Sequence, residues 1–201
     1  MGLQKQTISG NGLGTFGNVT LDNSLGIDMV DNSTINGRLT FTNGNLYIDD
    51  YLLTLGSAAA IAGTPDADHM ILLNGVISDL GVRKLFSAGA DDFTFPIGVA
   101  GKYTPVRYNI TSNGAAGNIL IRPINFKHPS TFENPAATNE LQYYWNVVSS
   151  GFSGLTVDHE YHYSDGDALP DETDYVVGRF TTATYTWSVP ATGVVNAGSD
   201  N

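Results

Sequence analysis

A repeat of about twenty residues in the first sixty positions constrains the fold of this chain more than any other feature. Apolar side chains alternate with polar ones, and Asn, Asp or Gly separates each short stretch from the next, which is typical of β-strands with one buried face. Three such strands make one turn of a parallel β-solenoid, and each turn buries its inward side chains against the next. The pairs that recur after nineteen or twenty residues are Val19/Leu21 with Leu39/Phe41 and Ile27/Met29 with Leu46/Ile48, and Leu53/Leu55 follow the region of Ile35 by a similar interval.

The repeat occupies residues 1–64 and contains about two such turns. Because two turns bury little apolar surface, a solenoid of this length needs a cap or a neighbouring domain. The same alternation also fits a plain antiparallel meander. The repeat therefore leaves two arrangements open, a short parallel β-solenoid and a β-meander.

After residue 64 the strand candidates become longer and the twenty-residue interval is lost. Turn residues punctuate the chain at regular spacing, and no segment has a convincing period of 3.6 residues, so residues 65–201 are expected to form an antiparallel β-sandwich. The chain is thus predicted to be all-β, with a solenoid-like region followed by a sandwich. The strand candidates of the second region are 70–78, 82–87, 92–98, 104–110, 117–124, 142–149, 155–163, 175–180 and 184–189, and 127–141 is a polar loop.

Composition excludes several classes of function. The chain has 201 residues, a net charge of −11 and only 14% charged residues, and this acidity would repel the phosphates of a nucleic acid. The absence of cysteine excludes disulfides, thiolate metal sites and cysteine nucleophiles. No apolar run approaches the roughly 18 residues that a membrane-spanning helix needs, so no membrane insertion is expected.

Aromatic residues alternate along the last strand candidates, which places several of them on common faces. They are most simply the inner layer of the sandwich, because Tyr and Trp bury large areas and keep a polar group. An exposed aromatic platform for sugar rings is the alternative. The residues that share faces are Val157, His159, Tyr161 and Tyr163; Tyr143, Trp145 and Val147; and Tyr185, Trp187 and Val189.

Catalytic motifs are not recognisable. Ser153 lies in "GFSGL", which does not match a G-x-S-x-G nucleophile elbow. His159 and His162 point to opposite faces of one strand and so cannot share a zinc ion. Carboxylates such as Asp158 and Glu160 are present, but nothing singles out a glycosidase pair. We therefore expect no enzymatic activity and no catalytic residues.

The segment "YHYSDGDALPDETDY", residues 161–175, is the most acidic part of the chain. Calcium takes six to eight oxygen ligands, and a loop with Asp-x-Asp and glycine suits it, although the EF-hand spacing is absent. The other interpretation is a solvated hairpin loop between strands that end at Tyr163 and resume at Tyr175, and this is the one that we favour. The candidate calcium ligands are Asp165, Asp167, Asp171, Glu172 and Asp174.

Three segments resemble large surface and secreted proteins of Bacteroidetes, in which solenoid turns precede an F-P-I/V-G … Y-x-P-V segment and a β-sandwich. They are "GRLTFTNGNLYIDDYLLTLGS" (37–57), "RKLFSAGADDFTFPIGVAGKYTPV" (83–106) and "YYWNVVSSGFSGLTVDHEYHYSDGD" (143–167). The resemblance covers roughly residues 10 to 190. It implies an extracellular protein, often exported by the type IX system, that serves as an adhesin, filament or scaffold.

We therefore expect a non-enzymatic structural or adhesive module of a bacterial surface protein, cut from a longer chain, whose partners are neighbouring domains or further copies. The alternative is a carbohydrate-binding module of a secreted polysaccharide-degrading enzyme, which would bind surface glycans through exposed aromatic rings. Ice binding through threonine rows has less support, because "TFT" (40–42) occurs once and no matching row is recognisable in the neighbouring repeats.

Overall fold

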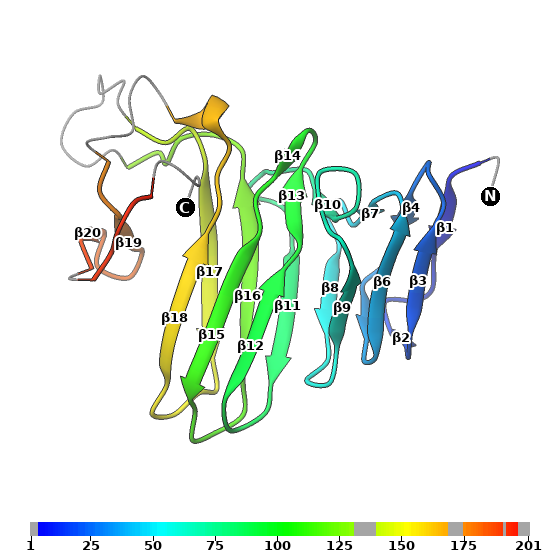
Figure 1. Cartoon of the computed structure of the whole chain (residues 1–201), viewed down its shortest axis with the longest axis horizontal. Helices are drawn as coiled ribbons and strands as arrows, with labels where there is room; N and C mark the ends of the chain where they lie inside the picture. The colour runs from blue at the N-terminus through cyan, green and yellow to red at the C-terminus, as the bar shows by residue number, and fades with distance from the viewer. Residues whose placement is uncertain (1–3, 131–139, 169–174, 191, 197–201) are drawn as a thin grey trace.

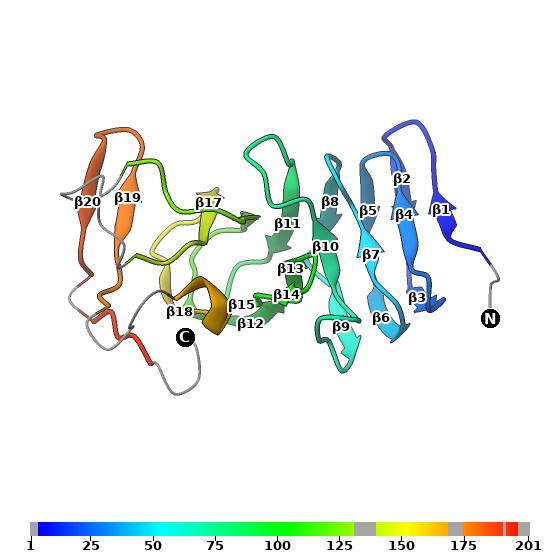
Figure 2. The same ribbon diagram turned by 90° about the horizontal axis from the view of Figure 1, so that it is seen from above.

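The computed structural model describes residues 4–130, 140–168, 175–190 and 192–196. It shows an elongated all-β molecule with the N-terminus at one end and a two-stranded hairpin at the other (Figures 1 and 2). The all-β prediction, with a solenoid followed by antiparallel sheets, is confirmed. No helix in the described part of the chain is long and apolar enough to cross a membrane.

Three sheets enclose the solenoid. Each coil, meaning one turn of the solenoid, contributes one strand to each sheet, and the strands pair in parallel. Sheet A contains β1 (Gln6–Ile8), β4 (Ile27–Met29), β7 (Leu46–Tyr47), β10 (Ile71–Leu73), β13 (Ile97–Val99) and β14 (Lys102–Tyr103), of which β14 is antiparallel. Sheet B contains β2 (Gly14–Phe16), β5 (Ser33–Ile35), β8 (Leu52–Leu55), β11 (Gly81–Phe86), β16 (Gly117–Ile124) and β17 (Tyr144–Ser150), and sheet C contains β3 (Val19–Asp22), β6 (Arg38–Asn43) and β9 (Ala60–Gly63).

The register confirms the repeat residue by residue and excludes the meander for this region. Val19 lies opposite Leu39, Leu21 opposite Phe41, and Ile27 opposite Leu46, all in parallel pairs. These side chains are buried except for Val19, which lies in the first coil. The alternation seen in the sequence is therefore the inward face of each coil.

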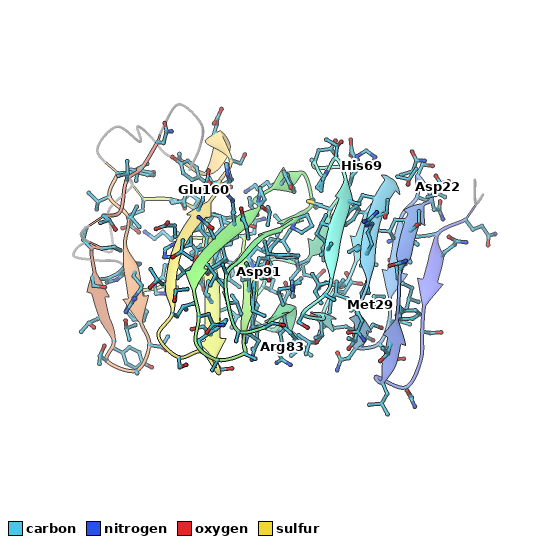
Figure 3. All side chains as sticks on the ribbon, turned by 60° about the horizontal axis from the view of Figure 1, so that its bottom comes forward. Asp22, Met29, His69, Arg83, Asp91 and Glu160 are labelled. Carbon is cyan, nitrogen blue, oxygen red and sulfur yellow. The ribbon has the colours of Figure 1, made fainter. Side chains whose placement is uncertain are left out.

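Sheet B joins the solenoid to the antiparallel part. β11 pairs in parallel with β8 on one side and antiparallel with β16 on the other. The second layer of the antiparallel part is sheet D, which contains β12 (Asp91–Phe95), β15 (Val106–Ser112) and β18 (Thr156–Tyr161). Side chains fill the space between the layers along the molecule (Figure 3), and one hydrophobic cluster extends from Leu21 to Ile121.

Parallel pairing continues beyond residue 64, because β10 and β13 extend sheet A and β11 extends sheet B. The division into residues 1–64 and 65–201 stays a prediction. The change from parallel to antiparallel pairing in sheet B lies at β11, and the two regions share that sheet.

The chain after Tyr163 differs from the expected hairpin loop. β18 ends at Tyr161, a short 3-10 helix (η1, Asp165–Asp167) follows, and the next strand is β19 (Arg179–Thr181). β19 pairs with β20 (Thr186–Ser188) and not with β18. The prediction of a strand at 175–180 that closes a hairpin with 155–163 is therefore wrong.

Candidate functional site

The described end of the solenoid at β1, β2 and β3 is open. Each of these strands is the outermost strand of its sheet and pairs on one side only, with β4, β5 and β6 respectively. We call the outer edges of these three strands the open end, and it lies at the N-terminal end of the molecule in Figure 2. Edge strands present backbone N–H and C=O groups that another strand can pair with.

Three apolar side chains of the first coil are less buried than their equivalents further in, whereas Leu21 is fully buried. Ile8, Phe16 and Val19 pack against the core but remain partly exposed. Their register partners Met29, Ile35 and Leu39 are completely buried. Leu13, which precedes β2, is 79% exposed. The open end thus presents the surface that each inner coil buries against its neighbour.

Few charged side chains lie close to the open end: Lys5 and Asp22 belong to the first coil, and the carboxylates of Asp28 and Asp31 reach it from the second coil, where Asp31 accepts a hydrogen bond from the Gly10 N–H. Lys5 and Asp22 are the only charged residues between positions 4 and 27, so this segment is neutral in a chain of net charge −11. The ammonium group of Lys5 lies 2.5 Å from the Asp28 carboxylate and 3.3 Å from the centre of the Tyr47 ring. Its charge is therefore matched within the molecule.

Asparagine side chains connect neighbouring coils at the corners. The Oδ1 atom of Asn18 accepts a hydrogen bond from the backbone N–H of Arg38 at 2.8 Å, and Asn32 accepts one from Leu52 at 2.8 Å. Both bonds span twenty residues, which is one coil. The asparagine-rich turns therefore contribute to the stacking of the coils.

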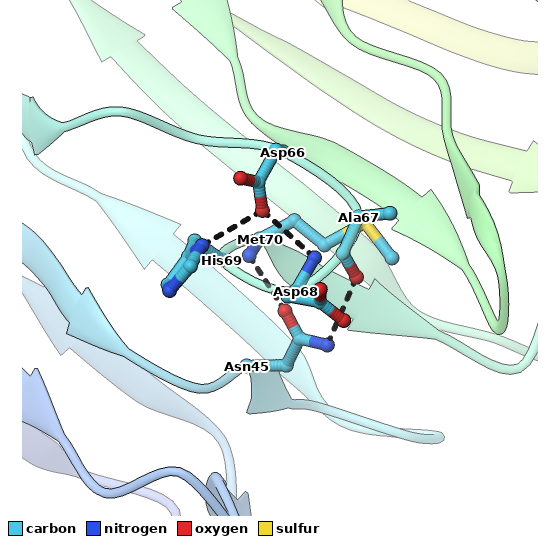
Figure 4. A network of polar contacts seen from close by, with 6 residues as sticks. All are labelled: Asn45, Asp66, Ala67, Asp68, His69 and Met70. Atoms are coloured by element: carbon cyan, nitrogen blue, oxygen red, sulfur yellow. Dashed lines mark hydrogen bonds and ion pairs between the residues drawn. The ribbon is translucent and has the colours of Figure 1, made fainter.

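Figure 4 shows a further asparagine at the loop before β10. Asn45 accepts a hydrogen bond from the backbone of Met70 at 2.7 Å and donates one to the carbonyl of Ala67 at 3.2 Å. Asp66 accepts from the N–H of Asp68 and lies 2.7 Å from Nδ1 of His69. The contacts of Asp66 and His69 thus support the fold of this turn.

The opposite end of the molecule differs from the open end. The rings of Tyr144, Phe180 and Trp187 surround His128 at 4.6–5.0 Å, and Trp187 donates a hydrogen bond to the carbonyl of Ser130 at 2.8 Å. His128 therefore connects the β19–β20 hairpin to the start of β17. The two ends therefore present unlike surfaces.

The aromatic residues that could form a sugar platform lie mostly between the sheets. Tyr143 and Tyr163 are buried, and the Tyr108 and Tyr161 hydroxyls are 2.6 Å apart. Burial raises the pKa of both Tyr108 and Tyr161 above the ordinary value. The inner-layer interpretation fits the rings of β17 and β18.

Four residues expected on the inner face are exposed, and two of them are Val147 on β17 and His159 on β18. Tyr185, which was grouped with Trp187, is 81% exposed, and Val189 is also exposed. Both belong to the β19–β20 region, which forms a sheet of its own rather than a layer of the sandwich.

The histidines have separate environments. Burial lowers the pKa of His159, which packs on Tyr108 and Tyr161, while Nε2 of His162 lies 3.1 Å from the Glu160 carboxylate. No group of three or more His, Cys, Asp or Glu side chains that could hold a metal ion occurs among the described residues.

The structure uses the two described aspartates of the acidic segment differently. Asp167 is buried, and its Oδ1 atom lies 2.5 Å from the ammonium group of Lys102, which also donates to Asn125 at 2.7 Å. Asp165 is exposed. Asp171, Glu172 and Asp174 lie outside the described residues. Calcium binding by this set stays a prediction, which thermal melting in calcium and in a chelator would test.

Two buried charged groups were not singled out from the sequence. Lys84 points inward from β11, and its ammonium group donates to the carbonyls of Gly56, Ser57 and Leu85 at 2.7–3.0 Å. Asp79 accepts from the N–H groups of Gly75 and Val76, and burial raises its pKa. Both groups hold backbone turns, which is a structural role.

Threonine rows are present on the outward faces, contrary to the expectation from the sequence. Thr15, Thr34 and Thr54 lie in register in sheet B, and Thr20 lies opposite Thr40 in sheet C. The threonines recur at the same interval of 19 or 20 residues as the apolar pairs, so the repeat itself could have predicted these rows. The sheet B row ends at Arg83, which is the next residue in register.

Comparison with known proteins gives no identification, since no protein-family model, no curated protein and no solved structure matches this chain.

Proposed function

We propose that this chain is a non-enzymatic structural and adhesive module of an extracellular bacterial surface protein, which joins neighbouring domains or copies. The observation that carries the proposal is the open end. Three adjacent strands, β1, β2 and β3, expose their backbone edges together with partly exposed apolar side chains. Such a surface is typical of a place where another β-structure stacks.

The architecture suits a module that transmits load. Sheet B runs from β2 at the open end to β17 near the other end, so hydrogen-bonded strands connect the two ends. The buried charged groups Lys84, Asp79 and Asp167 are held by turns or by a partner cation. The resemblance of residues 37–57 and 83–106 to surface proteins of Bacteroidetes supports an extracellular location.

The test is protease treatment of intact cells that produce the protein, followed by immunodetection. We expect the chain to be labelled by antibody and cleaved on intact cells, while a periplasmic marker protein stays protected. Cells that lack the protein should attach less well to surfaces or to one another. Full protection of the chain on intact cells, with cleavage only after lysis, would contradict the proposal.

A further inference from the structure

We propose that the open end binds the same end of a second copy, so that two chains form a closed, two-fold symmetric dimer. This inference rests on the proposed structural role and names the partner of the open end. The contact would add one coil-to-coil interface to those already present inside the solenoid, where β4, β5 and β6 cover β1, β2 and β3 from the other side.

The strand arrangement is compatible with a two-fold axis. When such an axis passes through β2 at right angles to the solenoid axis, β2 pairs antiparallel with its own copy, and β1 faces β3 of the second copy. The two strands differ by one residue in length, since β1 has 3 residues and β3 has 4. Every open edge then has a partner, and an isologous contact of this kind is closed.

The small number of charges in segment 4–27 is compatible with self-association at this end. Two chains of net charge −11 repel each other. The segment 4–27 carries one cation, Lys5, and one carboxylate, Asp22, so a contact at the open end brings together far less charge than the −11 of the whole chain. Association would remove the apolar surface of Leu13, Phe16 and Val19 from contact with water, which is favourable.

A head-to-tail filament is less favoured by the same observations. It would place the open end of one copy against the end that carries β17, β18 and the β19–β20 hairpin. There the hairpin is held against His128 and Ser130, and the neighbouring strands are antiparallel. The parallel coils of the open end would therefore meet antiparallel strands, and the solenoid would not continue from one copy into the next.

The absence of cysteine permits a direct test by cross-linking. Thr15 is the middle residue of β2 and is exposed. In the proposed dimer it lies opposite its own copy, and directly opposed Cβ atoms in antiparallel strands are about 4.5–5.5 Å apart. We therefore expect Thr15→Cys to form a disulfide-linked dimer under mild oxidation, since a disulfide needs a Cβ separation close to that range.

Thr40→Cys is the matched control, because Thr40 is also outward-facing but lies one coil further in, between Thr20 and Ala62. It should remain uncross-linked. Ser149→Cys, on β17, reports on the other end, and a mixed Thr15→Cys/Ser149→Cys disulfide would show head-to-tail contact and overturn the proposal.

The wild-type chain should have twice the 21.4 kDa mass of the monomer in light scattering at high concentration. Thr15→Lys would place two like charges opposite each other at the two-fold axis. This variant should therefore have the monomer mass, with an unchanged circular dichroism spectrum. A wild-type chain that is monomeric at every concentration overturns the dimer, but it leaves the surface location to be decided by the intact-cell experiment.

Discussion

Asp165 and Asp167 lie two positions apart in one acidic segment, and the fold gives them different environments. The Asp167 carboxylate is buried beside Lys102, which tethers η1 to β14, while Asp165 faces solvent. The sequence showed the cluster but not this division, because the partner cation is 65 residues away along the chain.

Substitution of these two aspartates separates the two environments. Asp167→Asn removes the charge that pairs with Lys102 and should lower the free energy of unfolding by about 2 kcal/mol. Asp165→Asn should change it by less than about 0.5 kcal/mol. Urea unfolding of both variants measures the difference, and equal effects would show that the Lys102 contact contributes nothing to stability.

Lys84 carries a charge in the hydrophobic core, between Phe86 and Phe93. The alternation in strand 82–87 already places Lys84 on the same face as Val82 and Phe86, so its burial could have been predicted. Its carbonyl acceptors in the preceding coil could not, because Gly56 and Ser57 come from a turn 28 and 27 residues earlier, respectively.

The buried Lys84 makes stability depend on pH. Burial lowers its pKa in the folded state below the ordinary value of 10.5, so on raising the pH the folded chain loses this proton before the unfolded chain does. The unfolded state then binds more protons, and stability rises towards pH 10.5. We expect the wild type to gain melting temperature relative to Lys84→Met between pH 7 and pH 10. Parallel pH profiles for the two proteins would contradict a lowered pKa.

At the scale of strands, the sequence predicted the register where the coils have equal length. Ile27 and Leu46 are 19 residues apart and lie opposite each other. Further on, Leu46 pairs with Ile71 and Ile71 with Ile97, after 25 and 26 residues. These longer loops remove the periodicity, which is why the continued parallel pairing of β10 and β13 was not predicted.

The antiparallel strands were found by alternation alone, and their partners were not. The pattern in 175–180 resembles a strand, yet only Arg179–Thr181 pairs, and with β20. Alternation reports one buried face but carries no information on which strand lies alongside. A solenoid is expected to have ends with unpaired backbone groups, but the alternation does not show which end is open, since that depends on which strands lack a neighbour.

Turns between strands depend on glycine where the coils approach closely. Gly44 has φ +78°, and a Cβ atom there would overlap the carbonyl oxygen of Asn23 in the preceding coil. Gly12 has φ +76° but open space around it. We expect Gly44→Ala to lower the free energy of unfolding by about 2–4 kcal/mol and Gly12→Ala by about 1 kcal/mol. Both variants strain the left-handed backbone, but only Gly44→Ala also forces two neighbouring coils apart.

Thermal melting of the two glycine variants measures this difference. A similar loss for both would mean that the strain of the backbone dominates and that the coils can separate at Gly44 without cost.

At the scale of the whole molecule, the solenoid and the antiparallel region behave as one continuous structure. Sheet B passes through both, and the hydrophobic cluster does the same. The antiparallel region therefore closes one end of the solenoid, which agrees with the expectation that so short a solenoid needs a cap or a neighbouring domain. The other end has no such cover among the described strands, and this asymmetry is the basis of the proposed function.

Hydrogen–deuterium exchange tests the central claim, association through the open end, most directly. Wild type and Thr15→Lys are compared at the same high concentration. The account predicts slower exchange in the wild type for amides within residues 6–22, and equal exchange in β10, β13 and β17. Equal exchange within residues 6–22, or protection that appears at β17 instead, would contradict it.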